Sequence, residues 1–333
     1  MLNGKVVLVT GGTGSWGNEM IHQLLSKYNP KQVRVYSRGE HRQVEMQQKF
    51  QRDDKLKFII GDVRDKNILN MAMKGVDVVF HLAALKHVPV CEDNVWEAVL
   101  TNIYGTQNVV EAAILNNVST VVDISTDKAV DAFNLYGMTK ACAEKIVINS
   151  GFNYATDVKF VCIRGGNVIG TNGSVIPLFK KQIKESNEIT LTDPNMTRYL
   201  MSTSQAIGLV FKAVEMSKGG ETLVMRMPAT TVQTIADSMI ELFGDERTKS
   251  TIIGTRPGEK LDEVLISKNE ATNAYQVDES YFVILPQKAP KETQDFYNSL
   301  RKLETHEFTS RNAVQLSRQD LTSVLSKEKW LMR

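Results

Sequence analysis

The chain has 333 residues, and its 40 basic and 38 acidic residues leave a formal charge of +2, too small for a nucleic-acid-binding surface. No apolar run reaches the ~18 residues of a membrane span, and the opening Met-Leu-Asn-Gly-Lys lacks the regions of a signal peptide. Three widely spaced cysteines without a CxxC pair argue against a disulfide framework or a metal site, so we expect a reducing, cytoplasmic location.

Short β-branched runs alternate with amphipathic helical stretches through the first half of the chain. We expect strands at residues 5–10, 32–37, 56–60, 77–83, 120–125 and 159–163. We expect helices at residues 16–27, 40–52, 66–73, 94–116 and 135–149. This alternation predicts an α/β protein with a doubly wound parallel sheet, the Rossmann fold.

Glycine, asparagine, threonine and proline become denser after residue 166. We therefore expect a Rossmann domain at 1–166, a smaller α/β substrate-binding lobe at 167–285, and a tail at 286–333. Part of the lobe, about 195–225, is expected to return to the Rossmann sheet. Short helices are expected at 176–185, 204–216, 234–243, 261–265 and 317–326, and a polar stretch at 278–293.

A glycine-rich segment follows the first expected strand and opens the first helix. It contains Gly11, Thr13, Gly14, Ser15, Trp16 and Gly17. Glycines here permit a tight turn and let backbone N–H groups approach a pyrophosphate at the helix N-terminus. A glycine triplet alone can be an ordinary turn, but the strand before it and the helix after it favour a dinucleotide site.

The end of the second strand distinguishes NAD from NADP. An acidic residue there would bind the ribose 2′-hydroxyl, whereas this chain has Ser37 and Arg38, which suit a 2′-phosphate. Arg42 can add charge, although either arginine can also be an ordinary solvated side chain. We predict NADP as the cofactor. Supporting positions are Asp62 and Val63, expected at the adenine, and Ala83 and Ala84, which leave room for the cofactor.

Tyr136 and Lys140 form a Tyr-x-x-x-Lys pair on an expected helix, where a spacing of four places both on one face. Lys140 can lower the pKa of the tyrosine and reach the nicotinamide ribose. Tyr136 then acts as the base that takes a proton from an alcohol as its hydride leaves. A surface pair would have the same spacing, but the preceding strand that ends in Ser125 and Thr126, whose hydroxyl assists the tyrosine, favours catalysis.

Asp127 and Lys128 follow that strand at once. Removing water next to a newly formed ketone requires a base for the α-proton and an acid for the departing hydroxyl. An aspartate and a lysine offer both groups, and a simple oxidoreductase needs neither. A salt-bridged loop pair remains the alternative.

Several segments together resemble the inverting UDP-N-acetylglucosamine 4,6-dehydratases, extended short-chain dehydrogenases/reductases that begin pseudaminic acid and related surface-polysaccharide pathways. The matching motifs span residues 4–266 and include GGTGSWG, YSRGE, AALKHVP, STDKAV, NLYGMTK, GNVIGTNGSVIP and RPGEKLDEVLI. The resemblance implies that Tyr136 deprotonates the sugar O4 while the C4 hydride passes to NADP+. It further implies that Lys128 is the base at C5 and Asp127 the acid at the C6 hydroxyl. The hydride then returns to C6, and C5 is inverted.

The resemblance also implies the residues that bind a UDP-sugar. Asn167 and Val168 are expected at the sugar, Ser174 and Val175 at the nucleotide, Arg198 and Arg256 at the diphosphate, Glu259 at the uridine ribose and Lys86 at the edge of the sugar pocket. Guanidinium groups suit diphosphate oxygens, although either arginine can instead form a surface salt bridge. His87, which follows Lys86, can equally be structural.

Departures from the family pattern leave alternatives open. Gly165 stands where the family usually has an aromatic residue, Ala132 where it commonly has proline, and Cys91 falls in a loop near the expected pocket. A variant enzyme would form or consume a 5,6-ene of the UDP-sugar with the same residues. A sugar-nucleotide epimerase or reductase, or an NADP-binding regulatory protein without activity, are further alternatives. The helices at 94–116 and 135–149 are apolar enough for a four-helix interface, so we expect a homodimer, or a hexamer by family resemblance.

Overall fold

The computed structural model describes residues 2–154, 156–170, 174–255, 259–286, 288–289, 291–328 and 331. The parallel half of its central sheet consists of β1 (Val6–Thr10), β2 (Gln32–Ser37), β3 (Leu56–Ile60), β4 (Val78–His81), β5 (Thr120–Thr126) and β6 (Lys159–Gly165). Their spatial order, 3-2-1-4-5-6, is that of the Rossmann fold. The predicted doubly wound α/β class is therefore confirmed.

Four later strands extend this sheet beyond β6. They are β11 (Thr222–Met225), which is parallel to β6, and the antiparallel strands β16 (Tyr281–Ile284), β15 (Ala274–Gln276) and β17 (Arg301–Lys302). The sequence suggested only a polar stretch at 278–293, yet Tyr281, Phe282 and Val283 are buried in the core. These three residues form a strand because the open edge at β11 offers both backbone partners and an apolar surface.

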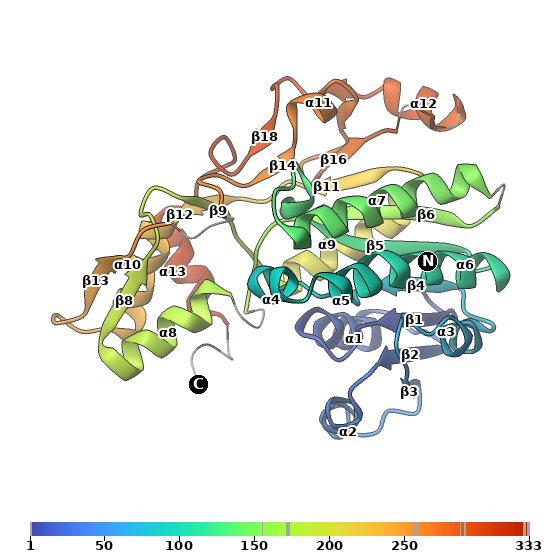
Figure 1. Cartoon of the computed structure of the whole chain (residues 1–333), viewed down its shortest axis with the longest axis horizontal. Helices are drawn as coiled ribbons and strands as arrows, with labels where there is room; N and C mark the ends of the chain where they lie inside the picture. Colours follow the sequence, from blue (N-terminus) through green and yellow to red (C-terminus); the bar gives the residue numbers. More distant parts are fainter. Residues whose placement is uncertain are drawn as a thin grey trace.

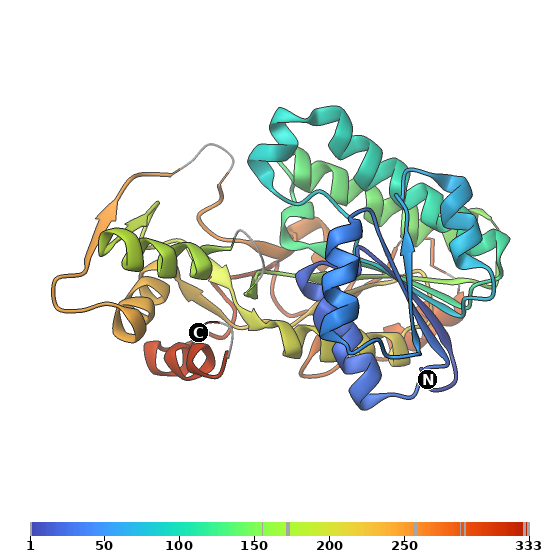
Figure 2. The same cartoon turned by 90° about the horizontal axis from the view of Figure 1, so that it is seen from below.

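Helices cover both faces of the sheet (Figure 1). On one face lie α1 (Ser15–Lys27), α2 (Glu40–Lys49) and α9 (Thr203–Met216), and on the other α3 (Lys66–Met73), α6 (Gly105–Leu115) and α7 (Leu135–Asn153). Figure 2 shows the two layers on opposite sides of the sheet. Buried side chains fill both interfaces, with Leu24 and Val210 on the first and Leu69 and Val109 on the second.

The helix expected at residues 94–116 is interrupted. After α4 (Val88–Asp93), α5 (Val95–Val99) passes into a π-helical turn, η1 (Leu100–Tyr104), before α6 begins. Asn102, within this turn, accepts a hydrogen bond from Leu85 N at 2.8 Å and donates to Leu85 O at 2.9 Å and to Thr139 Oγ1 at 2.9 Å. The wider turn thereby ties the loop after β4 to α7, a use of π-turns that is common at functional sites.

The smaller lobe lies beside the carboxyl ends of the parallel strands (Figure 1). As far as the structure describes it, its strands pair as β7 (Val168–Ile169) with β10 (Met201–Ser202), β8 (Glu188–Leu191) with β13 (Lys249–Ile252), and β9 (Thr197–Tyr199) with β12 (Ala229–Thr231). Its helices α8 (Val175–Ser186), α10 (Val232–Phe243) and α13 (Arg318–Ser326) share one core. Phe179, Met239 and Leu325 meet there, so the last helix completes the core of this lobe.

The short helix expected at residues 261–265 is wrong. The segment instead leads into a strand, β14 (Val264–Ile266), that pairs with β18 (Phe308–Thr309). Leu265 and Ile266 are both fully buried, so both faces of the segment are covered and its apolar spacing carries no helical period. The backbone N–H of Glu263 donates to Ser310 Oγ at 2.8 Å, which anchors this carboxylate just before the strand.

Candidate active site

The carboxyl ends of the parallel strands and the facing side of the smaller lobe enclose a cavity of about 1280 Å³. Pockets for one drug-sized ligand measure roughly 300–1,000 Å³, so this one has room for two sizeable ligands. The predicted site residues that line it are Gly11, Thr13, Gly14, Ser15, Trp16, Gly17, Ser37, Arg38, Asp62, Val63, Ala83, Ala84, Lys86, Thr126, Lys128, Tyr136, Lys140, Asn167, Val168, Ser174, Val175, Arg198 and Glu259. Asp127 is outside the set of described lining residues, and Arg256 lies outside the described part of the chain.

The glycine-rich loop has the close backbone contacts that a dinucleotide site requires. Gly11 has φ +66°, and a Cβ there would lie 2.8 Å from the backbone nitrogen of Ala83. A Cβ on Gly17 would lie 2.1 Å from the oxygen of Gly12, so any larger side chain would force the loop open. No described side chain caps the N-terminus of α1, whose N-cap is Gly14. Its N–H groups therefore remain available to an anion, and the loop fits a pyrophosphate.

The second strand ends with its polar groups at the rim of the cavity. Ser37 Oγ accepts a hydrogen bond from Gln43 at 3.0 Å, and Arg38 is exposed, with Nη1 3.7 Å from Asp62 Oδ2. Asp62 accepts from Arg64 Nε at 2.9 Å and Nη2 at 2.6 Å. Burial would raise the pKa of Asp62, but the hydrogen bonds and charge of Arg64 lower it below its usual value. The guanidinium of Arg38 is thus more accessible at this rim than that of Arg64, which is paired with Asp62.

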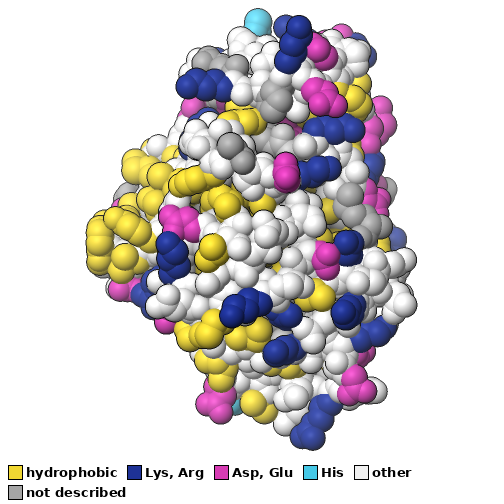
Figure 3. Space-filling view, turned by 90° about the vertical axis from the view of Figure 1, so that its right-hand side faces the viewer, with side chains coloured by type: hydrophobic (Ala, Val, Ile, Leu, Met, Phe, Trp, Pro, Cys, Tyr) yellow, Lys and Arg dark blue, Asp and Glu magenta, His cyan; other side chains and the backbone are white. Residues whose placement is uncertain are grey.

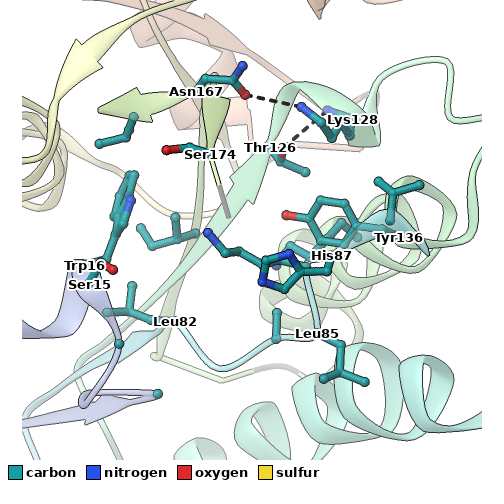
Figure 4. Close-up of a pocket in the computed structure, with 18 of the residues that line it drawn as sticks. Ser15, Trp16, Leu82, Leu85, His87, Thr126, Lys128, Tyr136, Asn167 and Ser174 are labelled. Carbon is teal, nitrogen blue, oxygen red and sulfur yellow. Dashed lines mark hydrogen bonds between the residues drawn. The ribbon is translucent and has the colours of Figure 1, made fainter. Parts of the chain in front are cut away.

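Tyr136 projects from the first turn of α7 into the cavity. Asn134 caps this helix by accepting a hydrogen bond from Gly137 N at 2.9 Å. Gly137 packs so tightly that a Cβ would lie 2.0 Å from Lys128 O. Figure 4 shows the phenol pointing to the open centre near Thr126 and Lys128, with Trp16 and Ser15 across the cavity. The Tyr–Lys helix is therefore clamped directly against the Asp127–Lys128 turn.

The pKa of Tyr136 is raised in this structure, because burial outweighs the opposite effects of Lys140, Lys128 and a hydrogen bond with Thr126. Lys140 acts in the direction that the sequence suggested, but the net direction differs. Burial of the phenol sets that net direction, and the ammonium of Lys140 is at the same time paired with a carboxylate. Its Nζ lies 3.1 Å from both carboxylate oxygens of Asp123, a fully buried residue of β5.

Lys128 sits in a cluster of polar groups around the turn after β5. Its Nζ donates to Asp127 Oδ1 at 3.0 Å, Asn167 Oδ1 at 3.4 Å and Glu263 Oε1 at 3.5 Å. Burial would lower the pKa of Lys128, but the two carboxylates together raise it. Thr126 Oγ1 also donates to Asp127 Oδ1, at 2.9 Å. Lys128 is therefore an ammonium that lies between the carboxylates of Asp127 and Glu263.

The roles expected of the Asp127–Lys128 pair remain a prediction, and this charge distribution gives the resting state from which they would start. A protonated Lys128 is no base, and Asp127 is fully buried beneath the cavity wall. Both expected roles require one proton to move from Lys128 to Asp127, which converts the ion pair into a neutral amine and a carboxylic acid. The oxygen Oδ2 of Asp127 is buried and has no hydrogen-bond partner among the described residues, so it is the oxygen of this carboxylate that no other donor occupies.

Polar groups from both sides of the cavity are open to a second ligand. Ser125 Oγ and Ser174 Oγ are buried and have no hydrogen-bond partner among the described residues, although both residues line the cavity. Arg198 donates to Thr197 O at 2.8 Å, and its Nε is 3.7 Å from Glu263 Oε1. Burial, followed by the charge of Lys128, lowers the pKa of Lys86. The lysine, the arginine and the two serine hydroxyls together suit an anionic, hydroxyl-rich ligand.

At Gly165, where the resemblance led us to expect an aromatic residue, the side that a Cβ would occupy is filled. A Cβ at this position would lie 3.2 Å from the sulfur of Met225 and 3.7 Å from that of Met227. Gly166 N donates to Met227 Sδ at 2.9 Å. Two flexible thioethers thus fill the space beside Gly165.

Glu263, Asp123 and Lys260 were absent from the predicted site. Glu263 and Lys260 line the cavity, and Lys260 Nζ donates to Val130 O at 2.7 Å, behind the Asp127–Lys128 turn. Glu263 is 135 residues from Lys128, and its surrounding sequence resembled a helix. No local signal reveals such contacts, because β14 and the turn after β5 meet only in the folded chain.

Comparison with known proteins places this geometry in context. A family model described as "Polysaccharide biosynthesis protein" matches residues 7–285. An uncharacterized membrane protein of Methanocaldococcus jannaschii is 43% identical over 304 residues, covering 89% of this chain and 90% of that protein. A UDP-glucose 4-epimerase of Rickettsia bellii is 39% identical over 326 residues, covering 96% and 95%. The X-ray structure of Pen from Bacillus thuringiensis is 37% identical, with a TM-score of 0.89, covering 98% of this chain and 99% of Pen.

The described helices contain none that combines the length and apolar character needed to cross a bilayer.

Proposed function

This chain belongs to the polysaccharide biosynthesis protein family, and we propose that it is an NADP-dependent UDP-N-acetylglucosamine 4,6-dehydratase. Its fold is that of nucleotide-sugar dehydratases and epimerases of the extended short-chain dehydrogenase/reductase type. The proposed product is UDP-2-acetamido-2,6-dideoxy-L-arabino-hex-4-ulose, a 4-keto-6-deoxy sugar inverted at C5. Such a product would feed pseudaminic acid or related surface-glycan synthesis.

The observation that supports dehydration is the cluster of Asp127, Lys128 and Glu263 beside Tyr136. Epimerisation at C4 needs only a base at O4 and a hydride acceptor. Loss of water from C5 and C6 needs in addition one group that accepts a proton and one that donates it. This cluster holds a transferable proton between an amine and two carboxylates, and its Lys128 and Glu263 line the cavity.

In the proposed reaction each residue either transfers a proton or positions a reacting group. Tyr136 takes the proton of the sugar O4, and Thr126 orients its phenol. A bound nicotinamide cofactor supplies the temporary acceptance and later return of a hydride. The C4 ketone acidifies the proton at C5, which Lys128 removes once its own proton has passed to Asp127. The protonated carboxyl then supplies the proton with which the C6 hydroxyl leaves as water, and C5 is reprotonated from the opposite face.

NADP rather than NAD is proposed from the rim of the cavity. Arg38 is exposed there and Ser37 lies beside it, which suits a 2′-phosphate. Lys86, Asn167, Val168, Ser174, Val175, Arg198 and Glu259 are proposed to contact the UDP-sugar, and Arg256 is proposed at its diphosphate.

We also propose a homodimer through α5, η1, α6 and α7. Trp96 is 61% exposed, and Val95, Tyr104, Leu115 and Met138 are also exposed hydrophobic residues of these elements. Figure 3 shows hydrophobic side chains gathered along one side of the face it draws. An exposed apolar surface on paired helices favours association with a second copy.

The deciding experiment is incubation with UDP-N-acetylglucosamine in D2O, followed by mass spectrometry and NMR of the product. Loss of one water, deuterium at C5 and the L-arabino configuration support the proposal. Lys128→Met should abolish water loss, whereas Lys145→Met, which changes an exposed lysine of α7, should react normally. Water loss at the normal rate in Lys128→Met would remove the cluster from the mechanism.

Two other outcomes point to other functions. A product of unchanged mass and altered C4 configuration would support a UDP-sugar 4-epimerase, the activity for which the Rickettsia relatives are named. An accumulating 5,6-ene, or turnover only of a supplied 5,6-ene to a product of the same mass, would support the pathway variant. Either outcome uses the same Tyr136 and Lys140.

A further inference from the structure

A row of buried polar residues crosses the central sheet beneath the cavity. Thr10, His81, Asp123 and Cys162 are register neighbours on β1, β4, β5 and β6. Each is at most 1% exposed. Strands that are covered on both faces are usually continuous apolar runs, so four adjacent polar positions require a reason.

Asp123 carries the negative charge of this row. His81 Nδ1 is 2.7 Å from Thr10 Oγ1 and its Nε2 is 3.1 Å from Thr106 Oγ1, while burial lowers the pKa of His81 to about 4. Burial raises the pKa of Cys162, and its thiol donates to Asp123 Oδ2 at 3.5 Å. His81 is therefore neutral and Cys162 a thiol, which leaves the carboxylate as the charged member.

Both oxygens of Asp123 bind Lys140, and Lys140 in turn borders the cavity beside Tyr136. The titratable groups that face Lys140 are Asp123, Tyr136 and Cys162; those that face Tyr136 are Lys140, Lys128 and Asp127. The ammonium of Lys140 stands between a phenol above and a carboxylate below. The carboxylate therefore fixes the position of the ammonium and cancels part of its field at the phenol.

We propose that Asp123 is a positioning residue that holds Lys140 beside Tyr136 and offsets its charge, so that proton transfer at the tyrosine is set by a carboxylate beneath the cavity. This inference rests on the proposed function for the role of Tyr136. The pairing of Asp123 with Lys140 can be tested without it.

The first test is the pH dependence of kcat/KM for the Asp123→Asn variant. Asparagine keeps the shape but leaves the ammonium of Lys140 uncompensated, so the phenol loses its proton more easily. The acidic limb of the profile should move to lower pH by about one unit, and the plateau should fall because Lys140 is held less firmly. The matched control is Cys162→Ala, which alters the same row without removing a charge and should leave the limb in place. An acidic limb that stays in place or moves to higher pH would overturn the proposal.

The second test measures thermal unfolding and needs no substrate. Asp123→Asn leaves a buried ammonium without its counterion, so Tm should fall by roughly 5–10 °C. Adding Lys140→Met should recover most of that loss. Additive losses in the double variant would show that the two residues are uncoupled and would overturn the proposal. If the wild type converts no nucleotide sugar, the proposed function fails, while this double-mutant cycle still decides whether Asp123 holds Lys140.

Discussion

Replacing Arg164 with methionine tests how the walls of the cavity are joined. Arg164 is buried in β6 and donates to Glu144 of α7 at 3.0 and 2.6 Å. It also donates to Glu270 of α11 (Lys268–Ala271), twice at 3.0 Å, and to Leu265 O at 2.9 Å. Helix α7 carries Tyr136, and Leu265 follows Glu263 by two residues. The guanidinium of Arg164 therefore connects the elements that position Tyr136 and Glu263.

The expected cost of Arg164→Met follows from the charges that it leaves behind. Five hydrogen bonds are lost, and the Glu144 carboxylate, which is 5% exposed, and the Glu270 carboxylate, 25% exposed, lose their counterion. Breaking a buried ion pair in this way costs about 3–5 kcal/mol. The methionine replaces part of the apolar volume, so repacking adds little. Tm should fall by roughly 10 °C.

The assay is urea unfolding at two pH values. Burial would raise the pKa of Glu270, but Arg164 lowers it below its usual value. A depressed pKa gives stability that is present above the unfolded-state value of about 4.3 and is lost as the pH falls through the folded-state value. In Arg164→Met the Glu270 carboxylate takes up a proton more readily, so the deficit should shrink between about pH 7.5 and pH 5.

The matched control combines Arg164→Met with Glu144→Gln and Glu270→Gln. Without the carboxylates there is no unpaired charge, so this triple variant should regain most of the lost stability. A deficit below about 1 kcal/mol, or one that is the same at both pH values, would refute the reasoning, because neither outcome fits an uncompensated buried charge.

Three further predictions concern the site and the proposed interface. Tyr136→Phe should lower kcat by at least about 10²–10⁴-fold while NADPH binding, followed by fluorescence, stays unchanged; surviving turnover would disprove its assigned role. Arg38→Ala should weaken NADP+ binding by about 10–100-fold and leave NAD+ binding unaffected in calorimetry, and equal losses for both cofactors would argue against a 2′-phosphate contact. Trp96→Glu should shift the protein toward monomers in sedimentation, and an unchanged dimer would locate the interface elsewhere.

Much of the fold followed from the sequence because its signals are local. Each parallel strand is formed by a buried apolar run, and Gly11 permits the tight turn that follows the first of them. These signals correctly predicted the parallel strands and the class of the fold. They failed at residues 261–265 and 278–293, where short segments pair with strands far away in the sequence and tertiary contact overrides local pattern.

The sequence by itself determined which chemical groups this protein carries and which neighbours share a strand end or a helix face: Lys128 after Thr126, and Lys140 one turn from Tyr136. The tertiary structure alone decided which charged groups surround them, and so the direction in which the pKa values of Lys128, Tyr136 and Lys140 are shifted. In the folded chain Asp127 is fully buried, Glu263 contacts Lys128, and Asp123 pairs with Lys140. The physical reason is that the affinity of a side chain for a proton depends on its burial and on charges a few ångströms away. Both arise only when distant segments of the chain meet.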